Sequence, residues 1–313
     1  HLTHTARVTQ VDEGDAAVIS ATTHPSGEGH GLASVLGAQR AGVMGADHGN
    51  LSPRVVACPR ILARVTVRHM PHTITHALVW RDMWCVTFPA GPWHTNCYLV
   101  AAREGTPDER VPCVIIDPGV GAAEPVRKLL DEHHLEAVGV LATHGHIDHV
   151  YTAEELSRDL DIPVWIHPDD EHLLSDPLAG LGADAEPLLQ SFHGSTELTP
   201  PSDVRHIAPG TDIELAGFTF TTRHAPGHTR GSILFSLDAA QTGQVPVTFT
   251  GDVVFAGSIG RTDLPGGDTA TLMASLRDQV LTLPPGSALL PGHGPATTLA
   301  QEKSQNPWLT DIR

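Results

Sequence analysis

LATHGHIDHV, residues 141–150, places His144, His146, Asp148 and His149 within six positions. The residues before them, EAVGVLAT, predict a buried strand, and DHVYTAEELSRDL predicts a helix, so the cluster lies in the loop at a strand end. A separation of two residues puts His144 and His146 on one side of an extended chain, while Asp148 and His149 can point to a second centre. Imidazole and carboxylate together suit zinc, iron, manganese or nickel, so the stretch predicts a metal site.

Three further motifs also begin where a predicted strand ends. They are PGHTRGS with His228, FTGD with Asp252 and PGHG with His293. Two metal ions need about six to eight ligands, which one loop cannot supply, so these three residues would complete the set. Thiolate is missing from the group, which argues against a purely structural zinc site.

Strand and helix patterns interleave from residue 84 to the end of the chain. WCVTF, CYLVA and CVIIDPG are short apolar runs closed by turn residues, and AAEPVRKLLDEHH has an apolar helical face with its proline in the first turn. The expected class is therefore α/β or α+β, with layered sheets.

The first 82 residues have a different composition. They contain no Phe, Tyr or Lys and only one late tryptophan, Trp80, and they show little sustained periodicity. We therefore predict that residues 1–82 are a disordered or appended arm, or are foreign to the natural protein, whose start would be Met83. Residues 83–313 are then the folded domain.

Composition limits the classes of partner. The formal charge is −17 and only Lys128 and Lys303 are lysines, which argues against nucleic-acid binding. No apolar run reaches 18 residues, so no membrane span is expected, and the first residues do not resemble a secretion signal. The four cysteines form no CxxC pair, which favours a reducing cytoplasm. We expect a cytoplasmic protein that acts on a small molecule, and the sequence indicates no protein partner.

The ordered motifs THGHIDH, PGHTRGS, FTGD and PGHG resemble those of the metallo-β-lactamase superfamily, over residues 84–313. The resemblance implies an αββα sandwich, two mixed sheets flanked by helices, with two divalent metal ions at one edge, most simply zinc, with iron or manganese as alternatives. It also implies a role for each residue of the cluster. The first ion would be bound by His144, His146 and His228, the second by Asp148, His149 and His293, and Asp252 would bridge them.

Among the branches of that superfamily, GDVVFAGSIGRTDLPGG and PGHGPATT are most similar to glyoxalase II-like hydrolases, which cleave S-2-hydroxyacylglutathione thioesters. Too few residues follow His293 for the helical C-terminal domain of glyoxalase II, so the chain would be a short form. Arg261 matches in charge a family residue that contacts glutathione, but Asp263 replaces a family tyrosine. Arg261 is therefore either a substrate contact or the partner of Asp263 in a local ion pair.

The implied chemistry needs no protein nucleophile, and the sequence has no GxSxG motif. A water bridging two ions has its pKa lowered from about 15.7 to about 7, and the resulting hydroxide would attack the thioester carbonyl. Asp148 is interpreted as a ligand first and a proton acceptor second. Three alternatives remain: a mononuclear iron persulfide dioxygenase of the same fold with a similar GRTD stretch, a lactone or ester hydrolase, and a non-catalytic binding module.

Overall fold

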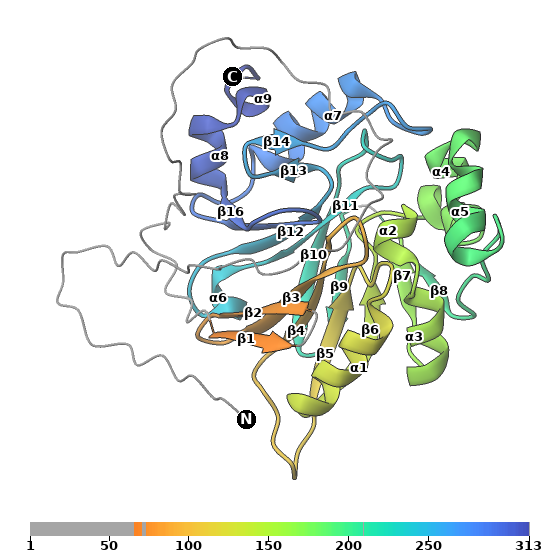
Figure 1. Ribbon diagram of the computed structural model, residues 1–313. Helices are drawn as coiled ribbons and strands as arrows, with labels where there is room; N and C mark the ends of the chain where they lie inside the picture. The colour runs from red at the N-terminus through yellow and green to blue at the C-terminus, as the bar shows by residue number, and fades with distance from the viewer. Residues whose placement is uncertain (1–65, 71–72, 209, 313) are drawn as a thin grey trace, which may run out of the picture. The chain divides into compact units, whose positions relative to one another are not determined.

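The computed structural model describes residues 66–70, 73–208 and 210–312, and its helices and strands are drawn in Figure 1. Eight strands form the first sheet and lie in it in the order in which they follow along the chain. They are β1 (Thr66–Met70), β2 (Thr73–Val79), β3 (Trp84–Ala90), β4 (Thr95–Ala101), β5 (Val111–Ile116), β6 (Leu135–Leu141), β7 (Val164–Ile166) and β8 (Val204–His206). Strands β1 to β5 pair antiparallel, and β5 to β8 pair parallel, so the sheet is mixed.

The second sheet has six strands in the order β16-β15-β12-β11-β10-β9. They are β9 (Asp212–Leu215), β10 (Phe218–His224), β11 (Ile233–Leu237), β12 (Val247–Gly251), β15 (Ala288–Pro291) and β16 (Thr297–Thr298). Only β12 and β15 pair parallel. A separate ribbon pairs β13 (Val254–Phe255) with β14 (Ser258–Ile259).

Helical segments make up the outer layers and the connections. The α-helices are α1 (Ala123–Glu132), α2 (Ile147–Val150), α3 (Ala153–Leu160), α4 (Leu178–Leu181), α5 (Glu186–His193), α6 (Ala239–Thr242), α7 (Thr269–Ser275), α8 (Leu299–Gln305) and α9 (Pro307–Thr310). Two 3₁₀ segments, η1 (Pro168–Leu174) and η2 (Ala183–Ala185), and a π-helical turn, η3 (Leu276–Val280), complete them. None of the described helices is both long and apolar enough to cross a membrane.

Three apolar clusters separate four layers. The first lies between α1, α3 and one face of the first sheet, the second lies between the two sheets, and the third lies between the second sheet and α7, α8 and α9. Figure 1 shows α1 and α3 on one side of the paired sheets and α7 and α8 on the other. The predicted αββα sandwich is therefore confirmed.

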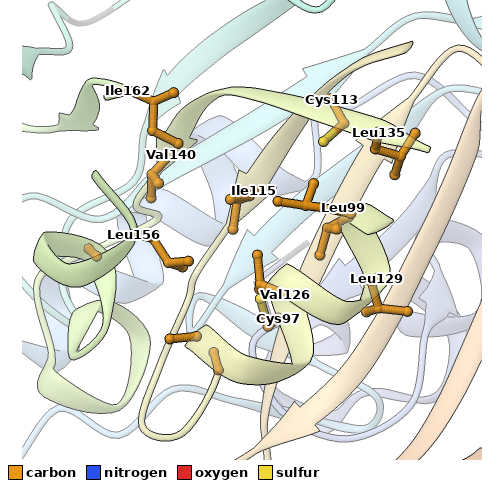
Figure 2. Close-up of a cluster of buried hydrophobic side chains, with 14 of the residues drawn as sticks. Cys97, Leu99, Cys113, Ile115, Val126, Leu129, Leu135, Val140, Leu156 and Ile162 are labelled. Carbon is orange, nitrogen blue, oxygen red and sulfur yellow. The ribbon is translucent and has the colours of Figure 1, made fainter. Parts of the chain in front are cut away.

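Helix α1 shows how the sequence builds an outer layer. Val126 and Leu129 are three residues apart and so project from the same face of the helix. Both are fully buried, and they pack in one cluster with Leu99 of β4 and Ile115 of β5 (Figure 2). Burying a Val or Leu side chain contributes about 1.5–3 kcal/mol, so this face holds α1 against the sheet.

Strand direction brings the predicted site loops together. Strands β5, β6 and β7 run parallel, so their carboxyl ends share one edge of the first sheet, and β12 and β15 do the same in the second. The loop that contains His228 joins β10 to β11, and Asp252 and His293 follow β12 and β15. Each predicted site residue therefore lies at or just beyond a strand end.

The predicted boundary at residue 83 is wrong for the fold. Strand β2 pairs with β3 from His76–Thr87 to Val79–Trp84, so the first sheet begins before Met83. Trp80 is also buried, in the cluster between the sheets. The composition that sets residues 1–82 apart does not show which of them pair as strands. Residues 1–65 lie outside the described residues, and the prediction that the natural protein starts at Met83 stays a prediction.

Candidate metal centre

Three of the predicted ligands form a first group: His144 and His146, which follow β6, and His228, from the loop between β10 and β11. The Nε2 atom of His228 lies 3.2 Å from Nε2 of His144 and 2.9 Å from Nδ1 of His146. All three side chains are buried, with residue exposures of 1–4%. One ring nitrogen from each lies within 4.8 Å of the others, a spacing that could hold a metal ion.

The second group lies beside it and is more open. The Nε2 atom of His293 lies 3.4 Å from Nε2 of His149 and 3.2 Å from Oδ2 of Asp148. The His149 side chain is fully buried, whereas that of His293 is 28% exposed. These three residues also present ligand atoms within 4.8 Å of one another. Access from solvent is therefore on the His293 side.

Asp252 lies between the two groups. Its Oδ1 is 3.3 Å from Nε2 of His149, and its Oδ2 is 3.6 Å from Nε2 of His228 and 3.5 Å from Nε2 of His293. One carboxylate therefore faces histidines of both groups. The structure thus brings together all seven residues predicted as ligands.

Backbone carbonyls fix the tautomers of two of the histidines. Nδ1 of His228 donates to the carbonyl of Arg261 at 2.8 Å, and Nδ1 of His293 donates to the carbonyl of Trp93 at 3.1 Å. A neutral imidazole that donates through Nδ1 carries a lone pair on Nε2. Both lone pairs therefore point into the centre.

The buried carboxylate of Asp117 orients the histidines of the loop that follows β6. The Asp117 carboxylate accepts from the backbone N–H of Thr143 at 2.8 Å and from its hydroxyl at 2.7 Å. Its Oδ2 also accepts from Nδ1 of His149 at 2.9 Å. The Thr143 oxygen is 3.1 Å from Nδ1 of His144, and because its own proton goes to Asp117, it accepts there. Each of these two rings therefore turns its Nε2 inward.

These contacts match what metal ions require. A histidine ligand ordinarily donates its outer N–H to a carboxylate or carbonyl, which fixes the ring and the tautomer. Among the described residues, Oδ1 of Asp252 and Nε2 of His146 are buried polar atoms without a hydrogen-bond partner. Such orphaned atoms are rare in protein interiors, and a cation at the centre would satisfy Oδ1 of Asp252. The residues present therefore fit a metal centre.

The protonation equilibria reflect the crowding of charges. Burial opposes a charge on His149, but Asp148, Asp252 and Asp117 together raise its pKa well above the usual value. Burial lowers the pKa of His146 to about 3, with His228 adding to the effect. Burial raises and the neighbouring histidines lower the pKa of Asp148, with a net shift downward. The three carboxylates around His149 therefore favour a positive charge there, either on the ring itself or on a bound cation.

Arg261 does not face the centre with a free guanidinium. Its Nε and one terminal nitrogen form a two-point ion pair with Asp263, at 2.7 and 2.8 Å, and both side chains are exposed. Its backbone carbonyl, by contrast, receives the bond from His228. The structure therefore has the local ion pair, and the predicted contact with substrate stays a prediction.

Sequence reasoning missed the residues that support the ligands. Asp117 was interpreted as part of a turn in CVIIDPG, although a carboxylate just after a buried strand at this edge was a usable signal. Thr95 donates to Oδ2 of Asp148 at 3.0 Å across 53 residues of chain. Asp170 is a third such residue, and its contacts appear only when the loops are assembled.

Comparison with known proteins agrees with this geometry. The family model described as the metallo-beta-lactamase superfamily matches residues 90–293. The chain is 34% identical over 222 residues to the hydroxyacylglutathione hydrolase GloC of Haemophilus influenzae, covering 71% of this chain and 95% of that protein.

Two solved structures are also similar. The BLEG-1 B3 metallo-beta-lactamase is 34% identical with a TM-score of 0.60, and the match covers 72% of this chain and 99% of that one. The structure of TTHA1623 in a di-iron-bound form is 36% identical with a TM-score of 0.56, covering 71% and 98%. With its four layers and its seven converging histidines and aspartates, the chain belongs to the metallo-β-lactamase superfamily, the family of metallo-hydrolases that its motifs had suggested.

Proposed function

We propose that the protein is a dinuclear metal-dependent hydrolase that cleaves thioesters of the S-2-hydroxyacylglutathione type. The observation that carries the proposal is the convergence of two complete ligand groups on Asp252. The similarity to the hydroxyacylglutathione hydrolase of H. influenzae supports the choice of substrate.

The two ions would be held as the motifs suggested. His144, His146 and His228 would bind the first, Asp148, His149 and His293 the second, and Asp252 both. Nitrogen and oxygen donors without thiolate suit zinc, iron and manganese alike. Zinc is the first choice, and the similar protein solved in a di-iron form makes iron the main competitor. When bound, such a pair supplies an activated water and polarises the substrate carbonyl.

In this proposal no side chain of the protein attacks the substrate; the side chains around the centre hold the metal ligands in place. Thr95 donates to Oδ2 of Asp148, which fixes a carboxylate able both to bind an ion and to accept a proton. The described cysteines are unsuited as nucleophiles, because burial raises the pKa of each thiol. The pKa of Cys113 is raised to about 12, and those of Cys85 and Cys97 are raised as well. Cleavage would therefore depend on the metal centre.

We favour the hydrolase over the dioxygenase alternative because of the second ligand group. An enzyme with one iron on a His/His/His/Asp set has no need of Asp148, His149 and His293 as a further converging group. Here these three lie within ligand distance of one another and beside Asp252. Lactones and other esters remain chemical neighbours of the proposed substrate, because an ester carbonyl meets the same activated water.

The test is hydrolysis of S-lactoylglutathione by the full chain reconstituted separately with zinc, iron and manganese. We expect turnover with at least one metal, none after chelation, and loss of at least 100-fold in kcat/KM for His293→Ala, since removing a metal ligand removes the activated water. His206→Ala is the matched control, because that histidine is exposed and paired with Glu171. Oxygen uptake with glutathione persulfide, or hydrolysis of a β-lactam or lactone but no thioester, would contradict the proposal.

A further inference from the structure

A third buried carboxylate, Asp170, lies beside the centre without facing it. It belongs to η1, which follows β7, and it is 1% exposed. Its Oδ2 accepts from the backbone N–H of Gly145 at 2.9 Å and from the hydroxyl of Thr229 at 2.7 Å. Its Oδ1 accepts from the backbone N–H of Gly231 at 2.8 Å. Three donors thus converge on one buried carboxylate.

These donors come from the two loops that supply the first histidine group. Gly145 stands between His144 and His146, and Thr229 follows His228 directly. The two loops are 82 residues apart along the chain, measured from His146 to His228. Asp170 therefore ties together the backbones that carry all three of these histidines.

The connection leaves little room for adjustment. A Cβ atom at Gly231 would lie 2.6 Å from Cγ of Asp170, and one at Gly145 would lie 2.8 Å from the Asp170 carbonyl oxygen. Real Cβ atoms do not come so close, so both loops rest directly on this residue. Thr229 is fixed further by the Ser232 hydroxyl at 2.8 Å.

The second histidine group is tied differently. His149 is bonded to Asp117, His293 to the carbonyl of Trp93, and Asp148 to Thr95. None of the three side-chain contacts of Asp170 is to these ligands or to a residue next to one of them. The structure thus has a support specific to the first group.

We propose that Asp170 is the positioning residue of the first metal site: it sets the distance between His228 and the pair His144 and His146, and so the affinity of the ion they share. The inference rests on the metal binding in the proposed function. An isosteric amide at this position keeps the volume but replaces one accepting oxygen with a donor, which would face a backbone N–H or the Thr229 hydroxyl. The loops would then separate, and the first site alone would weaken.

The experiment measures Zn²⁺ affinity site by site in the full chain. In a His293→Ala background the second group is broken, so competition with a fluorescent chelator reports the first site; in a His146→Ala background it reports the second. Asp170→Asn is added to each. We expect the dissociation constant to rise about 10–100-fold in the first background, as for other partners that orient ligands, and less than about 3-fold in the second.

An equal change in both backgrounds, or none in either, would overturn the inference, because a general loss of stability acts on both sites alike. Thr229→Val removes a single bond to Asp170 and should show the same site preference with a smaller change, which keeps the test valid if Asp170→Asn fails to fold. Circular dichroism of the metal-free variants checks folding. If the unsubstituted chain binds no Zn²⁺, the proposed function itself fails; if it binds two ions but Asp170→Asn shows no site preference, only this inference fails.

Discussion

Four of the five histidines of the centre are oriented by the hydrogen bond of their outer nitrogen; among the described residues, Nε2 of His146 has no such partner. His149 depends on Asp117, whereas His228 and His293 depend on backbone carbonyls that no substitution of a side chain removes. Asp117 is therefore the orienting group that mutation can test directly.

Replacing Asp117 with Asn should weaken metal binding. The amide can no longer accept from both Thr143 and His149 through two carboxylate oxygens, so His149 loses its fixed tautomer. We expect a loss of about 10–100-fold in Zn²⁺ affinity, measured by chelator competition. Asp203→Asn is the control, since that carboxylate is exposed and, within the described part of the chain, is bonded to the Arg205 side chain. Unchanged affinity in Asp117→Asn would show that the bond to His149 is unimportant.

A second test asks whether the Arg261 side chain contacts the substrate or only pairs with Asp263. Its exposed ion pair with Asp263 predicts that Arg261→Ala changes the free energy of unfolding by no more than about 1 kcal/mol. Because the guanidinium is held by Asp263, we also expect KM for S-lactoylglutathione to stay within about 3-fold. A tenfold rise in KM would instead restore Arg261 as the substrate contact that the family resemblance implied.

The turn between β10 and β11 is tightly constrained. Gly227 precedes His228 and has φ of +129°, a conformation that L residues rarely adopt. A Cβ there would lie 2.3 Å from the backbone nitrogen of Leu272 in α7. Close packing of α7 against this turn therefore fixes the position of His228.

Gly227→Ala should accordingly destabilise the fold by about 2 kcal/mol or more, from both the strained backbone and the clash. The matched control is Gly286→Ala, where φ is +82° and no atom lies within 4 Å of the added carbon, so only the backbone cost remains. Urea unfolding of the metal-free variants measures both. Equal losses in the two variants would mean that α7 adapts to the added methyl group.

The sequence predicts that a helix or strand is present better than it predicts the type of helix or its exact bounds. The helix with Val126 and Leu129 and the strand before His144 were predicted because apolar periodicity is local. The type of helix is such a detail: residues 168–174 form the 3₁₀ segment η1, and residues 269–280 form α7 followed by the π-helical turn η3. Such differences depend on packing with distant segments, which periodicity does not contain.

For the whole molecule, the four layers and the seven candidate ligands could be predicted because ordered motifs at strand ends identify the superfamily. Asp170 could not, because its partners Gly145 and Thr229 lie 25 and 59 residues away and become neighbours only in the folded chain. The paired strands before Met83 were not predicted, because residues 1–82 were treated as one segment on the basis of their composition.

Metal removal should affect the whole fold. Ions that bind only the native state stabilise it by RT ln(1 + [L]/Kd), about 2.7 kcal/mol at 100 times Kd. We therefore expect the melting temperature to fall when the ions are chelated and to recover when Zn²⁺ is returned. An unchanged melting temperature in a protein shown to have lost its ions would mean that the centre is preformed without any contribution from metal.

Mass spectrometry of the reconstituted full protein and of His293→Ala counts the metal ions per chain and so tests the dinuclear centre directly. We expect close to two ions in the unsubstituted chain and close to one in the variant, because only the second group loses a ligand. One ion in both proteins would contradict it and would leave Asp148, His149 and His293 without the role assigned to them.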